Sequence, residues 1–454
     1  MEKKLPKGWV ETNIGIISEI IRGVSYKKKE ATPVKQKNSI YILRGGNIQD
    51  GKINFDTDDN VYVDESLVGQ IQKIKKNDVV IVGSTGSKKL IGKAGIVESD
   101  LDTTSFGAFL MLLRTSLINQ RYHSYFFQTK YYRNTISELA GGVNINNIRR
   151  EHLENLVLPL PPLPEQERIV AKLDKLFAQH ENIKKALERI PQLLKDFRQQ
   201  VLERNFTGQN YVESSISIES ILKKEENNRW KWRKLLEIAR LESGHTPRKS
   251  NDEYWDNGDV NWISLQDIRA ADGTIINDTK FKPNLNGIKN SSARLLPKGT
   301  VCFCRDISVG FVTIMGKEMA TSQHFANWIC SDELNNKFLM YSLMSARKYL
   351  IRSGVGTTVG TIYMPAIKEM QIFIPTIEEQ QEIVCRVESL FAKADAIETR
   401  YQKLKEKVDA LPQAILHKAF KGELVPQLPT DGDAKDLLEE IMALKQEVKG
   451  KKKK

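Results

Sequence analysis

The sequence contains few cysteines and no long apolar segment. The four cysteines among its 454 residues are Cys302, Cys304, Cys330 and Cys385. None belongs to a Cys-x-x-Cys pair, so neither a disulfide framework nor a zinc site is indicated, and the CFC segment is interpreted as one strand with alternating faces. No apolar run approaches the ~18 residues needed to span a bilayer, and the opening MEKKLPKGWVE has no apolar signal region. We therefore expect a cytoplasmic protein that does not enter a membrane.

The sequence also lacks the motifs of several enzyme classes. A phosphate-binding loop requires G-x-x-x-x-G-K-S/T, but GSKKLIGKA (residues 86–94) places its glycines six apart and ends in Ala94. Neither a G-x-G-x-x-G dinucleotide fingerprint nor the Asn-Pro-Pro-aromatic motif of an adenine methyltransferase occurs, and the six histidines are scattered. We expect a chain that binds and positions other molecules, with no catalytic residue, no metal and no bound cofactor of its own.

Negatively charged residues are in the minority. Asp and Glu total 57 against 69 Lys and Arg, which gives a net charge of +12 and a pI near 9.2. This balance favours a polyanionic partner, either nucleic acid or an anionic membrane, without choosing between them. The plainer alternative is that the positive charge serves only solubility. The length of the chain suggests roughly two to four domains.

What the sequence does contain is an internal repeat. PPLPEQERIVAKLDKLFA, residues 161–178, returns as PTIEEQQEIVCRVESLFA, residues 375–392. The segments that begin at Glu165 and Glu379 match at 7 of 14 positions without a gap, and the offset of 214 residues persists on both sides of them. The chain is therefore predicted to consist of a unit, a connector, a second unit and a second connector.

The predicted units and connectors differ in character. Short β-rich runs punctuated by Gly, Asn and Asp, such as NDVVIVGSTGS and GTVCFCRD, predict units of mixed α/β structure. The predicted fold class is α+β, with two similar units joined by two long helices. The predicted boundaries are 1–160 for the first unit, 161–208 for the first helix, 209–227 for a linker, 228–374 for the second unit, 375–422 for the second helix and 423–454 for a charged tail. The lysine-rich ending is interpreted as solvated, with nonspecific phosphate contact as the less favoured alternative.

Both connectors have the residue spacing of a coiled coil. Apolar positions alternate four and three residues apart over more than four heptads, which is the signature of supercoiled helices. His180 falls in this seam and is interpreted as a polar residue that fixes the register. Pro191 and Pro412 interrupt the pattern and should bend or break the helices. The apolar residues expected to pack helices or partners are Ile169, Leu173, Leu176, Ile183, Leu187, Ile383, Val387, Leu390, Ile397 and Tyr401.

Each helix has a single apolar seam, so the two seams are expected to cover each other. If an approximate two-fold axis relates the halves of the chain, the helices must run antiparallel. The span from Ile169 to Val201 is roughly 50 Å long at ~1.5 Å per residue. The helix pair is therefore predicted to act as a spacer between the two units.

Two segments resemble a known family. LPLPPLPEQERIVAKLDKLF (158–177) is similar to the proline-rich, Glu-Gln-containing start of the central helix in specificity subunits of type I restriction-modification systems. SGHTPRKSNDEYWDNGDVNWISLQDI (243–268) resembles the opening of a target recognition domain in that family. The similarity extends over nearly the whole chain, including the order of the repeats, although the charged tail is longer than the family pattern suggests.

This resemblance implies the partners of the chain. Two target recognition domains would each read one half of a split site in double-stranded DNA, while the helices set the spacer and dock two modification (methyltransferase) subunits. Restriction subunits would add ATP-driven translocation and cleavage. S-adenosylmethionine, ATP and Mg are expected on these partner subunits and not on this chain. The alternative from another class is a non-enzymatic coiled-coil adaptor or scaffold that binds only protein.

The residues expected to contact DNA are polar and basic side chains in loops, because these can enter a groove without emptying a core. Lysine and arginine would supply salt-dependent phosphate contacts, while arginine can pair with guanine and asparagine with adenine. The candidates in the first unit are Arg44, Ser87, Lys88, Lys89, Lys93, Asn144, Asn146 and Asn147. The candidates in the second unit are Thr246, Arg248, Lys249, Arg269, Arg305, Asp306, Thr357 and Thr358. A loop lysine is often merely solvated, so the loops carry this prediction rather than any single residue.

Overall fold

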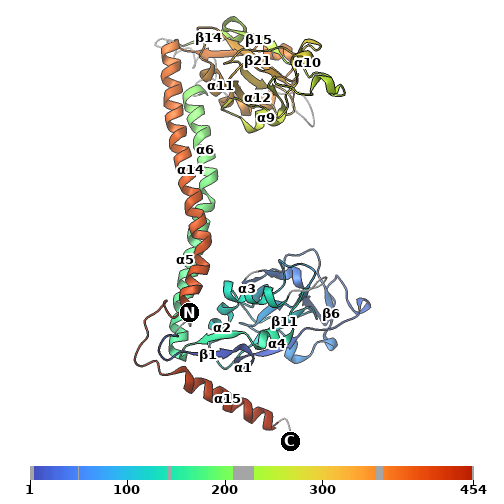
Figure 1. The fold of residues 1–454 in the computed structure, drawn as a ribbon, viewed down its shortest axis with the longest axis vertical. Helices are drawn as coiled ribbons and strands as arrows, with labels where there is room; N and C mark the ends of the chain where they lie inside the picture. The colour runs from blue at the N-terminus through green and yellow to red at the C-terminus, as the bar shows by residue number, and fades with distance from the viewer. Residues whose placement is uncertain (1–4, 50, 141–145, 208–229, 354–360, 452–454) are drawn as a thin grey trace. The chain divides into compact units, whose positions relative to one another are not determined.

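The computed structural model describes residues 5–49, 51–140, 146–207, 230–353 and 361–451 (Figure 1). The chain divides into two compact units. Unit 1 is formed by Met1–Leu187 with Lys403–Lys454, and unit 2 by Glu188–Gln402. Each unit combines a mixed α/β body with one part of each connector, so the long helices are divided between the units.

The body of unit 1 is built on a four-stranded antiparallel sheet. Its strands are, in spatial order, β2 (Glu19–Arg22), β11 (Leu110–Arg114), β7 (Val79–Val82) and β9 (Ala94–Ile96). Val79 packs in one apolar cluster with helices α2 (Gln120–Phe126) and α3 (Lys130–Leu139), whereas Val80 packs in a second cluster. Because both faces of the sheet are buried, the VVIV run needs no polar alternation. A smaller sheet contains β10 (Thr104–Phe106), β3 (Ser39–Leu43) and β6 (Tyr62–Asp64).

The body of unit 2 is built on a five-stranded sheet. Its strands are, in spatial order, β15 (Ala239–Ser243), β21 (Phe325–Cys330), β18 (Val301–Cys304), β19 (Val312–Met315) and β17 (Ile275–Ile276). Cys302 and Cys304 lie in one apolar cluster and Phe303 in another, which confirms that CFC is a strand with alternating faces. Burial raises the pKa of Cys304 to about 11 and raises that of Cys302 further, so both thiols are protonated at neutral pH.

Each unit contains the same four elements around the start of a long helix. A first strand is followed by a four-residue helix and pairs antiparallel with a last strand, which leads into the long helix. In unit 1 these elements are β1 (Val10–Asn13), α1 (Ile14–Ile17), β13 (Val157–Leu160) and α5 (Leu163–Glu188). In unit 2 they are β14 (Lys231–Lys234), α8 (Leu235–Ile238), β22 (Gln371–Ile374) and α14 (Ile377–Phe420). The predicted internal repeat is confirmed in these elements.

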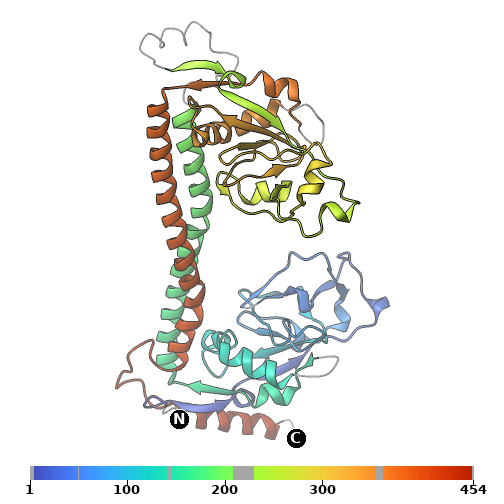
Figure 2. The same cartoon turned by 45° about the horizontal axis from the view of Figure 1, so that its top comes forward.

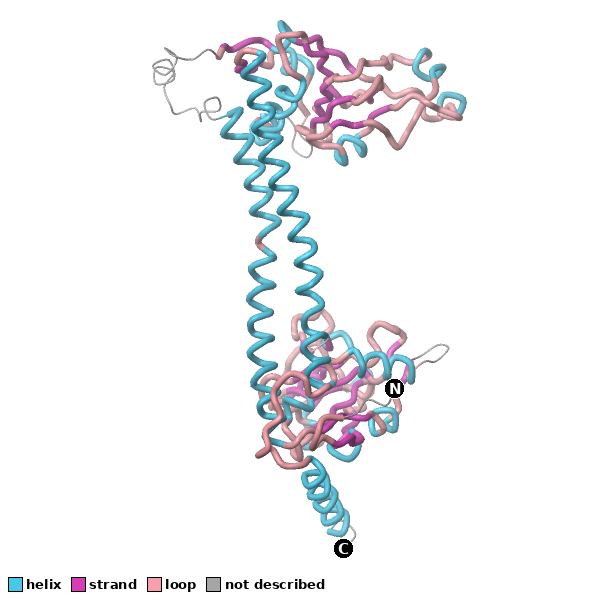
Figure 3. The backbone as a smooth tube through the Cα atoms, turned by 60° about the vertical axis from the view of Figure 1, so that its left-hand side comes forward, coloured by secondary structure: helices cyan, strands magenta, loops and turns pink. Residues whose placement is uncertain are grey.

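The long helices run antiparallel, as predicted (Figure 3). His180 of α5 lies against Val408 of α14, with 2.9 Å between the ring Nε2 and the Val408 carbonyl oxygen. Further along the chain, Arg198 of α6 (Ile190–Leu202) pairs with Asp395, which comes earlier in α14. Contacts therefore move backward along α14 as the chain advances through α5 and α6.

The predicted seam is buried along one narrow stripe. Residues seven apart are removed from solvent on both helices, because two helices enclose only the line of closest approach. These residues are Leu187, Leu194, Val201, Ala394, Tyr401 and Val408. Other predicted packing residues lie in the apolar cores of the units, namely Ile169, Leu173, Ile383 and Val387, or are half-buried, namely Leu176 and Leu390. Ile183 and Ile397 are 44% and 49% exposed, so the helix pair covers only part of each.

The two prolines affect the connectors differently. Helix α5 ends at Glu188 and α6 begins at Ile190, so the first connector breaks near Pro191 as predicted. Helix α14 continues through Pro412 as one helix. Of the predicted bend or break, the break is therefore contradicted at Pro412.

The segment 423–454, predicted to be a charged tail, returns to unit 1. Helix α15 (Ala434–Lys451) lies beside β1 and buries Ile441 in the core of that unit (Figure 2). Before this helix, Asp431 accepts two hydrogen bonds from the guanidinium of Arg168, at 2.6 and 2.7 Å. The segment is thus part of the folded body over much of its length.

Candidate nucleic-acid interface

Several of the predicted residues in unit 2 meet where strand β18 ends. Because β18 and β21 are antiparallel, Arg305 and Asp306, which follow β18, lie next to Gln323 and His324, which precede β21. Arg305 Nη2 donates to the carbonyl of Gln323 at 3.0 Å, and Thr246 Oγ1 donates to Gln323 Oε1 at 2.6 Å. Gln323 therefore joins candidates that are far apart in the sequence, although no local pattern had pointed to it.

Asp306 is held as an ionised carboxylate. Its Oδ1 accepts from Thr361 Oγ1 at 2.8 Å, and its Oδ2 accepts from His324 Nδ1 at 2.9 Å. Burial alone would raise the pKa of Asp306, but the hydrogen bonds from Thr361 and His324 outweigh burial and lower the pKa below its ordinary value. Because both oxygens accept from the protein, Asp306 fixes the loop that also carries Arg305.

Arg269 approaches the same loop from helix α9 (Leu265–Ala270). Its Nε donates to Ser308 Oγ at 2.7 Å, and its side chain remains exposed. Arg248 and Lys249 are also exposed, in the loop that follows β15. Two candidates of unit 2 lie outside the described residues, namely Thr357 and Thr358.

In unit 1, two of the predicted segments are neighbours in a small sheet. Strand β8 (Ser84–Thr85), which opens the lysine-bearing loop, pairs antiparallel with β12 (Asn146–Asn147). The exposed candidates here are Lys88, Lys89 and Asn147, and the half-buried ones are Ser87 and Lys93. The backbone of Asn146 pairs with Thr85, whereas Asn144 lies outside the described residues. The pairing places Asn147, which is suited to adenine, opposite the start of the loop that carries lysines suited to phosphate.

An arginine that the sequence did not single out fixes this loop. Arg133 of α3 donates from Nη1 to the carbonyl of Ile91 at 2.6 Å and from Nη2 to the carbonyl of Lys89 at 3.3 Å. One guanidinium thus binds two backbone oxygens of the loop. The backbone is restrained while the side chains of Lys88 and Lys89 stay in solvent.

Arg44, the remaining candidate, forms an ion pair with Asp59. Both side chains are substantially exposed, so DNA contact by Arg44 requires that phosphate or guanine replace the Asp59 carboxylate. Asn60, the residue that follows Asp59, lines a cavity of about 260 Å³. It is lined by Lys35, Ser39, Tyr41, Phe55, Asn60, Tyr62, Thr103 and Thr104.

Comparison with known proteins identifies the family of this chain. The family model described as "Type I restriction modification DNA specificity domain" matches residues 6–192 and 227–406. The chain belongs to this family. The chain is 34% identical over 469 residues to the type I restriction enzyme StySPI specificity subunit of Salmonella potsdam, covering 99% of this chain and 98% of the relative. It is also 34% identical over 490 residues to the EcoKI specificity subunit of Escherichia coli K12, with the same coverage.

The fold of this specificity subunit is also found in a solved structure. The HsdS subunit from Thermoanaerobacter tengcongensis superimposes with a TM-score of 0.63 at 19% sequence identity, over 93% of this chain and 99% of that chain. At this identity the likeness concerns the fold alone. It agrees with the repeated α/β units and long helices described above.

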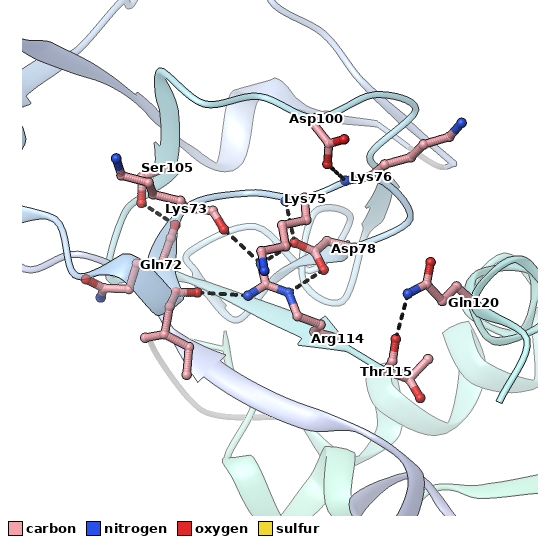
Figure 4. A network of polar contacts seen from close by, with 11 residues as sticks. Gln72, Lys73, Lys75, Lys76, Asp78, Asp100, Ser105, Arg114, Thr115 and Gln120 are labelled. Atoms are coloured by element: carbon pink, nitrogen blue, oxygen red, sulfur yellow. Dashed lines mark hydrogen bonds and ion pairs between the residues drawn. The ribbon is translucent and has the colours of Figure 1, made fainter. Parts of the chain in front are cut away.

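The specificity subunit has a further basic turn in unit 1 that the sequence analysis missed (Figure 4). Arg114 binds both carboxylate oxygens of Asp78, at 2.8 and 2.6 Å, and donates to the carbonyl of Lys73 at 2.8 Å. The hydrogen bond with Asp78 raises the pKa of Arg114. Lys75 and Lys76 are exposed on this restrained turn, and the run KIKK was the signal in the sequence that could have identified it.

In the part of the chain that the structure describes, no helix is both long and apolar enough to cross a membrane. Within the same residues, no three His, Cys, Asp or Glu side chains are grouped so that they could hold a metal ion. The four cysteines are free thiols.

Proposed function

We propose that this specificity subunit reads a bipartite DNA target, one half with each unit, and positions methyltransferase and restriction subunits there without catalysing a reaction itself. One observation supports the proposal most directly. The two units share the elements that join them to the long helices, whereas their exposed loops differ in residues and hydrogen bonding. A repeated scaffold with unlike loops suits a protein that reads two unlike sequences.

Phosphate and base contacts are assigned to different residues. The proposed phosphate contacts are Lys88, Lys89, Arg248 and Lys249, because long exposed side chains reach the DNA backbone without a fixed geometry. Arg305 is oriented by Gln323, and Arg269 by Ser308, as base reading requires. An oriented arginine suits guanine, and Asn147 suits adenine.

Partner binding is assigned to the long helices. These helices leave large apolar side chains partly exposed, namely Ile183, Leu193, Phe197, Ile397, Leu404 and Leu411. Exposed apolar surface of this kind is typical of protein interfaces. Two modification subunits are proposed because the helix start is duplicated. S-adenosylmethionine, ATP and Mg would then be bound by the partner subunits, and the assembly would act in the cytoplasm.

Binding by the complex with a modification subunit tests the proposal. Mapping methyl-adenine in a host that carries the system defines the target, and the complex should bind this duplex roughly 10³-fold or more tightly than a scrambled duplex at the same salt concentration. Replacing Lys88 and Lys89 by alanine should weaken binding to both duplexes and reduce the salt slope by about two. Arg305→Ala should weaken binding to the target alone. Equal affinity of the unsubstituted complex for both duplexes would favour a protein-only adaptor instead.

A further inference from the structure

One residue in unit 2 has a backbone conformation that is unusual for its type. Ile307 has a φ of 61°, in the left-handed region where a β-branched side chain is strained. The other non-glycine residues with positive φ in the described ranges are Asn38, Asn77 and Asn257, and asparagine tolerates this conformation. Ile307 differs from these asparagines because its apolar side chain cannot form the local hydrogen bond that stabilises asparagine in this conformation.

The strain at Ile307 is not offset by burial. Its side chain is 48% exposed, although it is apolar and β-branched. The amide of Ser308 donates to the carbonyl of Asp306 at 2.6 Å, which closes a three-residue turn with Ile307 at its centre. The form of this turn with positive φ is rare and strained. Folding stability alone would favour glycine or asparagine here.

Both neighbours of Ile307 are anchored, so the turn is imposed by its surroundings. Asp306 accepts hydrogen bonds from Thr361 and His324, and Ser308 accepts one from Arg269. A strained residue held in this way is typical of functional sites, where the surrounding structure fixes a conformation that the residue would not adopt by itself. The turn thus presents one apolar side chain at a defined position.

The residues around this turn are the proposed DNA readers of unit 2. Arg305 precedes the turn, and Arg269 is hydrogen-bonded to it, so the exposed side chain of Ile307 lies among groups suited to base edges. An apolar side chain cannot bind phosphate, but it can contact the one apolar group that base edges present in the major groove, the thymine methyl. We propose that Ile307 contacts a thymine methyl group and specifies a T·A pair in the half-site read by unit 2. This inference rests on the proposed function.

Uracil substitution in the DNA tests the inference. The complex with the modification subunit is titrated with its mapped target, in which each thymine of the half-site read by unit 2 is replaced in turn by uracil. Removing the methyl group should weaken binding roughly fourfold at one position, the effect expected for one buried methyl. A target in which no thymine of this half-site responds would overturn the inference.

Two substitutions separate the methyl contact from folding. Ile307→Gly relieves the backbone strain and removes the side chain, while Ile307→Asn keeps a side chain that tolerates positive φ. Both variants should melt no lower than the unsubstituted protein, and both should bind the thymine and uracil duplexes equally. Ile275→Ala is the matched control, because Ile275 is 47% exposed but lies in strand β17. The Ile275→Ala variant should still bind the thymine duplex roughly fourfold more tightly than the uracil duplex.

The outcomes distinguish this inference from the proposed function. If the unsubstituted complex prefers its target to scrambled DNA but the Ile307→Gly variant still distinguishes thymine from uracil, the methyl contact is made by another residue. If the Ile307 variants bind both duplexes more weakly by the same factor, so that the fourfold preference for thymine remains, the side chain supports binding without reading the methyl group, and the inference also fails. If the unsubstituted complex shows no preference for its mapped target, the proposed function itself fails.

Discussion

The two copies of the Glu-Gln dipeptide place their glutamines in the same role. In unit 1, Gln166 Nε2 donates to the carbonyl of Pro161 at 2.8 Å, and Oε1 accepts from the amide of Asn119 at 2.9 Å. Asn119 is the N-cap of α2, so one buried side chain ties the start of α5 to a neighbouring helix.

Unit 2 repeats this arrangement. Gln380 Nε2 donates to the carbonyl of Pro375 at 3.1 Å, and Oε1 accepts from the amide of Asn335, the N-cap of α11 (Asn336–Ser345), at 2.8 Å. Gln380 also donates to the carbonyl of Glu333 at 2.9 Å. The repeat preserves this glutamine because an apolar replacement would leave buried backbone groups without partners.

The glutamates of the two dipeptides have different roles. Glu165 is buried and accepts from Trp9 Nε1 at 2.9 Å, and burial raises its pKa. Glu379 is half-buried and exchanges reciprocal hydrogen bonds of 3.4 Å with Thr376 at the start of α14. Identity between the copies therefore does not guarantee identity of role. The glutamine makes equivalent contacts in both units, whereas the contacts of each glutamate depend on its neighbours, which are Trp9 for Glu165 and Thr376 for Glu379.

Exchanging a whole unit should change the methylated DNA site more than any other substitution considered below. If the scaffold is shared and the loops are independent readers, replacing residues 1–160 by the matching unit of a related protein should change one half of the methylated site completely. The measurement is a methyl-adenine map of the host genome. Exchanging residues 228–374 is the reciprocal control and should change the other half. A change in both halves after a single exchange would show that the units do not read independently.

Altering one long helix without the other should disrupt assembly. One extra heptad after Leu187 alone shifts the buried stripe against an unchanged α14, so co-purification of the modification subunit should be lost. Four extra residues after both Leu187 and Tyr401 keep the helices matched and lengthen each by ~6 Å. At ~3.4 Å per base pair, the spacer of the methylated site should grow by one or two base pairs. An active, assembled variant with an unchanged spacer would show that the helices do not set this distance.

Removing either glutamine should destabilise its own unit to a similar degree. Gln166→Leu and Gln380→Leu each leave buried backbone partners unpaired, which should lower the free energy of unfolding of that unit by about 2–4 kcal/mol. Glu379→Gln is the matched control, since it changes a half-buried cap and should cost under about 1 kcal/mol. Hydrogen exchange followed separately in α2 and α11 reports the two units. If one glutamine substitution leaves the free energy of unfolding of its unit unchanged while the other lowers it strongly, the two glutamines do not have equivalent roles.

The sequence predicted the features that repeat at short range. The heptad spacing predicted both long helices, the internal repeat predicted their antiparallel pairing, and the alternation around Cys302 and Cys304 predicted a buried strand. These features can be predicted because helices and strands each produce a regular spacing of apolar residues within a short segment of the sequence. The duplicated Glu-Gln segment likewise located the joint between each unit and its helix.

Features that depend on distant partners could not be predicted in this way. The bond between Thr246 and Gln323 joins residues brought together by the sheet, and the burial of Ile441 depends on a helix returning to unit 1. Neither has a local spacing signal. The roles of the individual candidate DNA residues remain predictions, because loops that bind DNA need exposed polar groups, and exposed polar groups are also ordinary surface.

The two long helices also differ at their prolines, since the first connector is broken near Pro191 whereas α14 continues through Pro412. A proline in a helix leaves the carbonyl four residues earlier without its usual amide donor. For Pro412 that carbonyl belongs to Val408, and it accepts a hydrogen bond from His180 Nε2 at 2.9 Å. Because a carbonyl can only accept, the His180 ring must carry its proton on Nε2. His180, interpreted from the sequence as fixing the register, supplies the bond that Pro412 removes, and α14 stays unbroken there.

A double-mutant cycle tests this compensation. His180→Phe keeps a ring in the seam but removes the donor, so it should destabilise α14 around Val408 by about 1–2 kcal/mol. In the Pro412→Ala background a backbone amide can bond to Val408, and the same histidine substitution should cost less than about 0.5 kcal/mol. Hydrogen exchange of the amides of residues 405–416 measures both effects locally, which avoids a global unfolding model for a chain with two units. An equal cost of His180→Phe in both backgrounds would mean that His180 contributes by packing and not by replacing the bond lost at Pro412.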